Sequence, residues 1–279
     1  MKRFGQCFLI DGNLLRKLVA AAGVTAHDVV LEVGPGTGTL TEELLAVAGH
    51  VLAVEIDNGL AGVCRERFGS SPKFTLLHAD VLACKSRIAP QVLAALAERR
   101  TALGGRAMLV ANLPYQAATP LLIELMMSPM KVSPLCFTVQ AEVADRLVAP
   151  PGGKDYGPIS VFAQASGRLE RIARVPPEAF WPAPRVESAM LRWDADEREP
   201  LPPAVKAALA RVVHACFNHR RKTMRANLRE LLNASSYQLI ASDGRWDLAD
   251  RPERLGPPQW LALARLLVER ETMSSTQPR

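Results

Sequence analysis

The chain has 279 residues, 48% of them hydrophobic, and its 34 lysines and arginines against 28 aspartates and glutamates give a formal net charge of +6. This length allows one large α/β domain with a smaller appendage, or two modest domains. The basic excess favours a polyanionic partner such as nucleic acid, although a generic basic enzyme has the same balance. No apolar run reaches the roughly 18 residues of a membrane span, so we expect no membrane partner.

The five cysteines are scattered, none of them forms a C-x-x-C pair, and the five histidines do not cluster with cysteines or carboxylates at ligand spacing. This pattern argues against a disulfide framework and a zinc site, so we expect no metal. The first eleven residues contain no long apolar segment of the kind found in signal peptides. We therefore expect a cytoplasmic protein, and a monomer.

Short apolar runs alternate with amphipathic segments through the first two-thirds of the chain. A helix is expected over residues 14–22. Buried strands are expected over residues 29–33, 51–56, 74–78 and 107–111, with helices between them over residues 39–48, 59–68 and 90–100. This alternation predicts a parallel sheet covered by helices on both faces.

The next elements complete the predicted sheet. A helix is expected over residues 121–127, and three further strands are expected over residues 135–139, 159–165 and 186–193. The sheet would then have seven strands and be mostly parallel, with some antiparallel strands at the end because their connections are short. Residues 149–157 are expected to form a loop, because they are rich in proline and glycine.

A polar, proline-rich segment over residues 194–203 indicates a domain boundary. We place the first domain at residues 1–194 and a smaller domain at residues 195–279. Helices are expected in the second domain over residues 204–217, 220–232 and 259–270, and the tail over residues 273–279 is expected to be disordered. The chain is thus predicted to have an α/β domain followed by a small all-helical domain.

A glycine-rich turn follows the first expected long strand, where Gly34, Gly36 and Gly38 have the spacing G-x-G-x-G. Glycines let the backbone bend tightly there and approach a ligand closely. A dinucleotide-binding turn has the spacing G-x-G-x-x-G, and Pro35 removes one backbone donor, so the turn suits a nucleoside without phosphates better than a pyrophosphate. A tight connection between a strand and a helix is the alternative explanation.

Polar side chains stand at the ends of the next strands. Glu55 can accept hydrogen bonds from both hydroxyls of a ribose, and Asp80 can accept from the amine of a cofactor adenine. Each has a plainer alternative, since Glu55 can be a surface acid and Asp80 a helix cap. Because Gly34, Glu55, Asp80 and Asn112 end successive strands, and ligands of open α/β sheets bind at that edge, we expect them to form one site.

The segment Asn112-Leu113-Pro114-Tyr115 closes the fourth expected strand. The amine of a purine is a poor nucleophile, and acceptors for both of its hydrogens return electron density to the nitrogen. The side-chain oxygen of Asn112 and the backbone carbonyl of Leu113 can supply these acceptors. Pro114 holds the loop open and Tyr115 can stack on the base. A loop with a buried tyrosine is the alternative.

These residues resemble the acceptor motif of amino-group methyltransferases that act on adenine. The wider pattern resembles the KsgA-type small-subunit ribosomal RNA adenine dimethyltransferases. The similar segments are FGQCFL at 4–9, EVGPGTGTLT at 32–41, VEID at 54–57, KDYGPISV at 154–161, FWPAPRVES at 180–188 and FNHRRKTMRANL at 217–228. The resemblance extends from about residue 3 to residue 270.

The resemblance implies a Rossmann-like class I methyltransferase fold that uses S-adenosylmethionine. Residues that match cofactor contacts of the family are Cys7, Leu9, Gly34, Gly36, Glu55, Asp80 and Asn112. Phe180 matches an aromatic residue that sandwiches the target base opposite Tyr115. The implied substrate is a pair of adjacent adenines in a hairpin loop near the 3′ end of 16S rRNA, in an immature 30S particle, each of which receives two methyl groups.

Cys7 departs from the family pattern, which has Asn at this position. If the backbone rather than the side chain contacts the cofactor, the change has little effect, and we favour this alternative because the surrounding motif is intact.

Residues 219–229 carry a run of basic side chains. The expected RNA contacts are Arg220, Arg221, Lys222, Arg225 and Arg229. On a helix over residues 220–232, Arg221, Arg225 and Arg229 would share one stripe that faces the phosphates of a folded RNA. A solvated helix face is the alternative.

Three other functions remain open from the sequence. A macrolide-resistance-type methyltransferase that acts on 23S rRNA resembles the chain through its catalytic domain. A non-catalytic nucleic-acid-binding relative would keep the fold without the reaction. A nicotinamide-dependent oxidoreductase agrees poorly with the glycine spacing.

Overall fold

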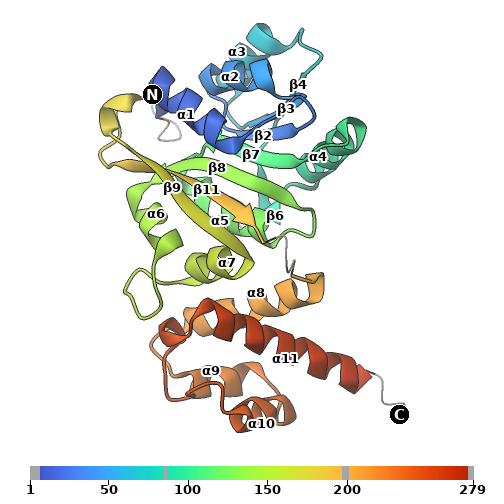
Figure 1. The fold of residues 1–279 in the computed structure, drawn as a ribbon, viewed down its shortest axis with the longest axis vertical. Helices are drawn as coiled ribbons and strands as arrows, with labels where there is room; N and C mark the ends of the chain where they lie inside the picture. Colours follow the sequence, from blue (N-terminus) through green and yellow to red (C-terminus); the bar gives the residue numbers. More distant parts are fainter. Residues whose placement is uncertain (1–6, 85–86, 197–200, 276–279) are drawn as a thin grey trace. The chain divides into compact units, whose positions relative to one another are not determined.

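The computed structural model describes residues 7–84, 87–196 and 201–275. The chain divides into two compact units, the first made of residues 1–144 and 168–195 and the second of residues 145–167 and 196–279 (Figure 1). Among the described residues, no helix combines the length and the apolar character that crossing a membrane requires. No group of three or more His, Cys, Asp or Glu side chains suited to a metal ion occurs among them.

Seven strands form the central sheet of the first unit, in the order β4-β3-β2-β7-β8-β11-β9. Their bounds are Val29–Val33 (β2), His50–Glu55 (β3), Phe74–His78 (β4), Ala107–Asn112 (β7), Val132–Gln140 (β8), Gly167–Val175 (β9) and Ser188–Ala195 (β11). Strands β4, β3, β2, β7 and β8 are parallel, and β11 is antiparallel to β8. The predicted seven-stranded, mostly parallel sheet is confirmed.

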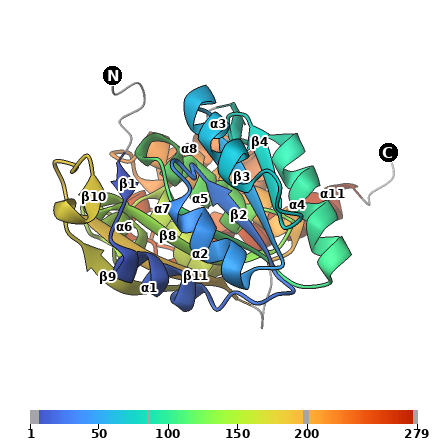
Figure 2. The same ribbon diagram turned by 90° about the horizontal axis from the view of Figure 1, so that it is seen from above.

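Helices cover both faces of this sheet (Figures 1 and 2). One face carries α1 (Gly12–Ala22), α2 (Thr39–Val47) and α3 (Asn58–Phe68), and the other carries α4 (Pro90–Leu103) and α5 (Tyr115–Met127). The apolar side chains of α1, α2 and α3 form one core cluster with those of β2, β3, β7, β8 and β11. Burial of this apolar surface is the main favourable contribution to the fold.

Side-chain caps fix where α1 and α3 begin. Asp11 accepts hydrogen bonds from the N–H groups of Asn13 and Leu14, and α1 begins at the next residue. Asp57 accepts in the same way from Gly59 and Leu60 at the start of α3. Such caps satisfy backbone donors that a helix leaves unpaired at its first turn. As a result, α3 begins only three residues after β3 ends, and the strand end is held at the edge of the sheet.

Two small antiparallel pairs lie outside the main sheet. β1 (Phe8–Leu9) pairs with β10 (Phe180–Trp181), which follows a short 3-10 helix, η1 (Pro177–Ala179). β5 (Leu82–Cys84) pairs with β6 (Arg87–Ile88). Figure 2 shows β1 beside β10 at one side of the sheet. The first pair therefore brings the N-terminal segment next to a segment about 170 residues later in the chain.

The second unit is helical. α6 (Ala141–Val148) joins the two units, and the second contains α7 (Pro158–Ser166), α8 (Pro203–Asn218), α9 (Met224–Leu231), α10 (Ala234–Asp243), the 3-10 helix η2 (Pro252–Arg254) and α11 (Pro257–Ser275). Three aromatic rings pack in its interior, with centroid distances of 6.2 Å from Tyr156 to Phe217 and 5.8 Å from Phe217 to Trp260.

The structure corrects the expected strand over residues 159–165, which is the helix α7. Its sequence is mostly apolar and most of its residues are buried, and such a short buried helix has the same hydrophobic pattern as a buried strand. The missing strand of the sheet is β9, whose charged sequence GRLERIARV gave no strand signal. β9 lies at one end of the sheet, where charged residues are common because they discourage pairing with other chains.

The compact units differ from the predicted domains in one segment. The last change from the first unit to the second falls between residues 195 and 196, one residue after the boundary predicted between residues 194 and 195. However, residues 145–167, which were predicted to belong to the first domain, belong to the helical unit. α11 continues to Ser275, three residues into the tail that was expected to be disordered. The rest of that tail, residues 276–279, lies outside the described residues.

Candidate active site

The glycine turn connects β2 to α2 in a conformation that only glycine adopts easily. Gly34, Gly36 and Gly38 have φ angles of 71°, 60° and 84°, in the left-handed region. A Cβ atom added to Gly36 would lie 2.6 Å from the ring of Phe8, and this distance is far below van der Waals contact. The side chain of any other residue would therefore displace Phe8 from its position against the turn.

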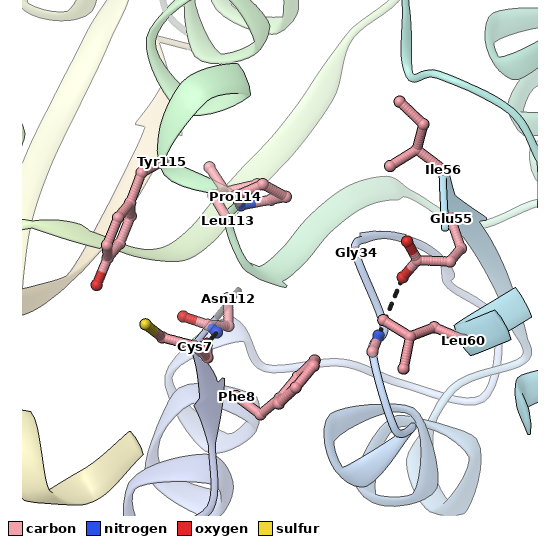
Figure 3. Close-up of a pocket in the computed structure, with 11 residues that line it drawn as sticks. Cys7, Phe8, Gly34, Glu55, Ile56, Leu60, Asn112, Leu113, Pro114 and Tyr115 are labelled. Carbon is pink, nitrogen blue, oxygen red and sulfur yellow. Dashed lines mark hydrogen bonds between the residues drawn. The ribbon is translucent and has the colours of Figure 1, made fainter. Parts of the chain in front are cut away.

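Glu55, at the end of β3, holds this turn in place through a hydrogen bond. Its Oε2 accepts a hydrogen bond from the N–H of Gly36 at 3.2 Å, drawn as the dashed line in Figure 3, and its Oε1 accepts from the N–H of Asp57 at 2.9 Å. The side chain is 3% exposed, so Glu55 is not a surface acid. Each carboxylate oxygen retains a second acceptor position for a ligand.

Two adjoining cavities lie at the carboxyl edge of the parallel strands. The smaller, of about 80 Å³, is lined by Gly34, Gly36, Glu55, Asn112 and Tyr115 among others. The larger, of about 590 Å³, is lined by Gly34, Glu55, Asp80 and Pro114 among others, so the two share a wall. Ligand sites have volumes of about 300–1,000 Å³. The polar residues at the strand ends therefore line adjoining cavities, with Asn112 in the smaller, Asp80 in the larger, and Gly34 and Glu55 in both.

Asp80 lines the larger cavity and caps no helix. Its Oδ1 accepts a hydrogen bond from the N–H of Leu82 at 2.9 Å, and the strand β5 rather than a helix follows it. The side chain is exposed, and its second carboxylate oxygen is available at the cavity wall. The helix-cap alternative is therefore wrong.

Asn112 lines the smaller cavity and contains an unsatisfied acceptor. Its Nδ2 donates a hydrogen bond to the carbonyl oxygen of Cys7 at 3.0 Å, and this bond fixes the orientation of the amide. Its Oδ1 is buried and has no hydrogen-bond partner among the described residues. A buried polar atom without a partner is costly, so this oxygen indicates a place where a ligand donates a hydrogen bond.

The residues after Asn112 form the side of the cavity shown in Figure 3. The N–H of Leu113 donates to the carbonyl of Thr138 at 3.1 Å, which fixes the peptide, and Pro114 precedes the first turn of α5. The Tyr115 hydroxyl lies 3.1 Å from Oγ of Ser188. Burial raises the pKa of Tyr115, and the contact with Ser188 opposes this effect. The phenol is therefore neutral at physiological pH.

Of the other expected contacts, Cys7 lines the smaller cavity, whereas Leu9 and Phe180 do not. Leu9 and Phe180 are paired across β1 and β10, and both side chains belong to the hydrophobic core. Phe180 is 3% exposed and lines neither cavity, so the structure does not place it opposite Tyr115.

Apolar residues that the sequence analysis missed complete the walls. Phe8, Ile56 and Leu60 line the smaller cavity, and Ile56 also lines the larger one (Figure 3). Ile56 is 46% exposed although it follows a fully buried strand. An exposed isoleucine directly after Glu55 offers an apolar surface for a base or sugar. The sequence analysis missed it because it placed residue 56 inside a buried strand, whereas β3 ends at Glu55.

The basic segment of the second unit is divided between a turn and a helix. α9 begins at Met224, so Arg221 lies in the preceding turn and does not share a helical stripe with Arg225 and Arg229. Thr223 caps the helix by accepting from the N–H of Ala226, which explains the later start.

Internal contacts occupy three of the five basic side chains. Arg220 donates to the carbonyls of Gly153 and Lys154 and pairs with Glu253 at 3.5 Å. Lys222 pairs with Glu230 at 2.7 Å, and the guanidinium of Arg229 lies over the ring of Tyr237. Arg221 and Arg225 are exposed, and no ion pair links them to a described carboxylate.

Comparison with known proteins identifies the family. A family model described as ribosomal RNA adenine dimethylase matches residues 1–267. The chain belongs to this family. A ribosomal RNA small subunit methyltransferase A from Hahella chejuensis is 37% identical over 264 residues, which cover 94% of this chain and 91% of the relative. One of the same name from Phenylobacterium zucineum is 38% identical over 279 residues, covering 100% and 92%.

Solved structures have the same fold as this adenine dimethylase. A dimethyladenosine transferase from Plasmodium falciparum superposes with a TM-score of 0.72 at 21% identity, covering 96% of this chain and 98% of the other. The 23S rRNA methyltransferase ErmE superposes with a TM-score of 0.65 at 22% identity, covering 93% and 99%. The class I methyltransferase fold that the resemblance implied is confirmed.

Proposed function

We propose that this adenine dimethylase transfers methyl groups from S-adenosylmethionine to N6 of adenine in the RNA of the small ribosomal subunit. The unpartnered Oδ1 of Asn112 is the main support for this proposal, because Asn112 lines the same cavity as Glu55. A purine amine is a donor that suits this oxygen. The names of the relatives, which refer to small-subunit RNA, support the choice of substrate.

The residues at the crevice fit the cofactor. The carboxylate of Glu55 is oriented by Gly36 and Asp57 to accept from ribose hydroxyls, and Asp80 stands where it can accept from the cofactor's adenine amine. Ile56 offers an apolar face between them. Bound there, S-adenosylmethionine supplies an electrophilic methyl group on a sulfonium sulfur. The protein residues then hold the donor and exclude water.

At the target base, Asn112 Oδ1 and the Leu113 carbonyl would accept the two N–H bonds of the amine. These two acceptors would orient the nitrogen lone pair for attack on a methyl donor bound at the crevice, and such positioning accelerates transfer reactions. Tyr115 would stack on the ring. Phe180 would have to leave the core to contact the base from the other side, so Tyr115 alone carries the stacking here. No general base is required, because the methylated nitrogen is acidic and loses its proton to water.

The finer substrate that we propose is a pair of adjacent adenines in the 3′-terminal hairpin loop of 16S rRNA, in an immature 30S particle, methylated by a monomer. Each adenine would receive two methyl groups. The bases must leave the stack to reach Asn112, and this costs least in an unpaired loop.

In the second unit, we propose that Arg221 and Arg225 contact RNA phosphates. Arg225→Ala should lower the slope of log binding affinity against log salt concentration by about one, without changing stability. Arg220→Ala is the matched comparison, because its guanidinium is occupied inside the unit: it should lower the thermal midpoint instead. An unchanged salt slope in an Arg221→Ala/Arg225→Ala variant would contradict the assignment.

The decisive test is transfer of labelled methyl groups to purified small subunits that lack the modification, followed by nucleoside analysis for N6,N6-dimethyladenosine. Asn112→Ala should abolish transfer while cofactor binding, followed with S-adenosylhomocysteine, stays detectable. Naked 23S rRNA serves as the competing substrate, because ErmE has the same fold. Preferential methylation of 23S rRNA, or cofactor binding without transfer to either RNA, would overturn the proposal.

A further inference from the structure

Trp181 has an exposed side chain beside the candidate active site. It is 67% exposed, the highest fraction among the exposed large apolar residues of the described chain. It begins a loop, residues 181–187, that ends where Ser188 is buried at the start of β11. We call these residues the rim loop. Single exposed apolar residues are common on protein surfaces, so it is the place of Trp181 next to the cavity, and not its exposure alone, that indicates a function.

One end of the rim loop is attached to a wall of the smaller cavity. Trp181 lies directly opposite Phe8 in the antiparallel pair of β1 and β10. Side chains at opposed positions of such a pair point to the same face, with Cβ atoms about 4.5–5.5 Å apart. Because Phe8 lines the cavity and packs against Gly36, the indole of Trp181 stands on the face that borders the crevice.

The other end is attached to the opposite wall. Ser188 follows the rim loop, and its hydroxyl contacts that of Tyr115 at 3.1 Å. The carbonyl of Glu187 accepts from the N–H of Ala141 at 2.9 Å, which fixes this end to β8 and α6. Figure 3 shows Phe8 and Tyr115 on either side of Asn112. The rim loop therefore runs between the two walls that flank the acceptor of the target amine.

The exposed side chains of the rim loop suit a nucleic acid strand. Arg185 is exposed and forms no ion pair with a described carboxylate, while its acidic neighbour Glu187 pairs with Arg174 at 2.7 Å. An indole stacks on bases irrespective of sequence, and a guanidinium binds phosphate. Both chemistries occur together where proteins hold unpaired strands.

We propose that Trp181 stacks on the RNA base adjacent to the target adenine, while Arg185 binds a neighbouring phosphate. This inference rests on the proposed function, because an adenine that enters the cavity leaves its neighbour without a stacking partner. Trp181 replaces that partner and so lowers the cost of extrusion. It contacts neither the cofactor nor the reacting nitrogen, so its effect falls on RNA binding and not on the chemical step.

The first test measures the Kd of unmodified small subunits by filter binding, which needs no catalysis, together with KM and kcat for methyl transfer. Trp181→Ala should raise Kd and KM about tenfold, within the range known for stacking of one base, and change kcat less than threefold. Trp181→Phe should restore both constants to within threefold. Val47→Ala, which removes an exposed apolar side chain at the other edge of the sheet, is the control and should change neither constant.

Tryptophan fluorescence gives a second, direct readout. The other three tryptophans, Trp193, Trp246 and Trp260, are 2%, 7% and 0% exposed, so emission at the red edge comes mainly from Trp181. An adenine-loop RNA hairpin, its binding followed by anisotropy of a label, should quench this emission in the native protein and not in Trp181→Phe. Bound hairpin with unchanged emission, or an unchanged Kd in Trp181→Ala, would overturn the inference.

These outcomes separate the inference from the function on which it rests. Normal methyl transfer with an unaffected Trp181→Ala variant refutes the inference and leaves the function standing. Absence of methyl transfer with a tenfold weaker Kd refutes the function and leaves the RNA contact standing.

Discussion

At the residue scale, the site depends on contacts between side chains and backbone. Asn112 is oriented by the carbonyl oxygen of Cys7, and Glu55 is oriented by the N–H groups of Gly36 and Asp57. Backbone groups provide these contacts whatever the side chain, as long as the local conformation is kept. The residue types at positions 55 and 112 are therefore constrained more strongly than the type at position 7.

Cys7→Asn tests this reasoning, because it restores the residue that the family pattern has at this position. The carbonyl that holds Asn112 is retained, so we expect the affinity for S-adenosylhomocysteine to stay within a few-fold of the native value. Isothermal titration calorimetry measures it. Asn112→Ala, which removes the other member of the hydrogen bond, serves for comparison. A tenfold or larger gain in Cys7→Asn would show that the side chain at position 7 takes part in cofactor binding.

At the element scale, the sequence predicted what strand and turn patterns determine locally. Gly34, Glu55, Asp80 and Asn112 were placed correctly at one edge because parallel strands carry their ends to the same side. The orientation of Phe180 could not be predicted in this way. Its motif does not determine whether the ring points toward the core or the cavity, and the structure places it in the core. The start of α9 was missed because the basic run that precedes Thr223 has good helix propensity of its own, and the cap decided the boundary.

The glycine turn allows an element-scale prediction with a matched control. Gly36→Ala imposes a left-handed alanine and drives a methyl group to within 2.6 Å of Phe8, which lines the cavity. Gly23→Ala imposes the same backbone cost, about 1–2 kcal/mol, at a φ of 59° with nothing within 4 Å. Gly36→Ala should therefore weaken S-adenosylhomocysteine binding at least tenfold, and Gly23→Ala less than twofold. Calorimetry and urea unfolding measure the two effects, and equal affinities in both variants would contradict the role of the turn.

At the scale of the whole molecule, a buried acid in the strand that leads into the glycine turn makes stability depend on pH. Glu32, on β2 below the glycine turn, is 1% exposed. Burial raises the pKa of Glu32 from 4.5 to about 8; the Thr41 hydroxyl, which donates to Oε2 at 2.7 Å, opposes this shift, and the charge of Glu55 adds to it. The protonation of this one side chain therefore affects the stability of the fold.

The sign of this effect follows from proton linkage. Between pH 4.5 and about 8 the folded protein holds a proton on Glu32 that the unfolded chain has released, so the contribution to stability falls as pH rises through this window. Burial lowers the pKa of His50 and of His214, which gives a slope of opposite sign below their ordinary pKa of 6.5. The prediction is therefore best made for pH 6.5 to 8 and as a difference between variants.

Glu32→Gln keeps the size of the side chain and an acceptor for Thr41 but cannot ionise. Its free energy of unfolding, measured with urea, should change less between pH 6.5 and pH 8 than that of the native protein, and the variant should be the more stable of the two at pH 8. Glu66→Gln, on the exposed surface of α3, is the control and should keep the native slope. Parallel pH profiles for Glu32→Gln and the native protein would mean that Glu32 does not hold its proton in the fold, and would contradict the prediction.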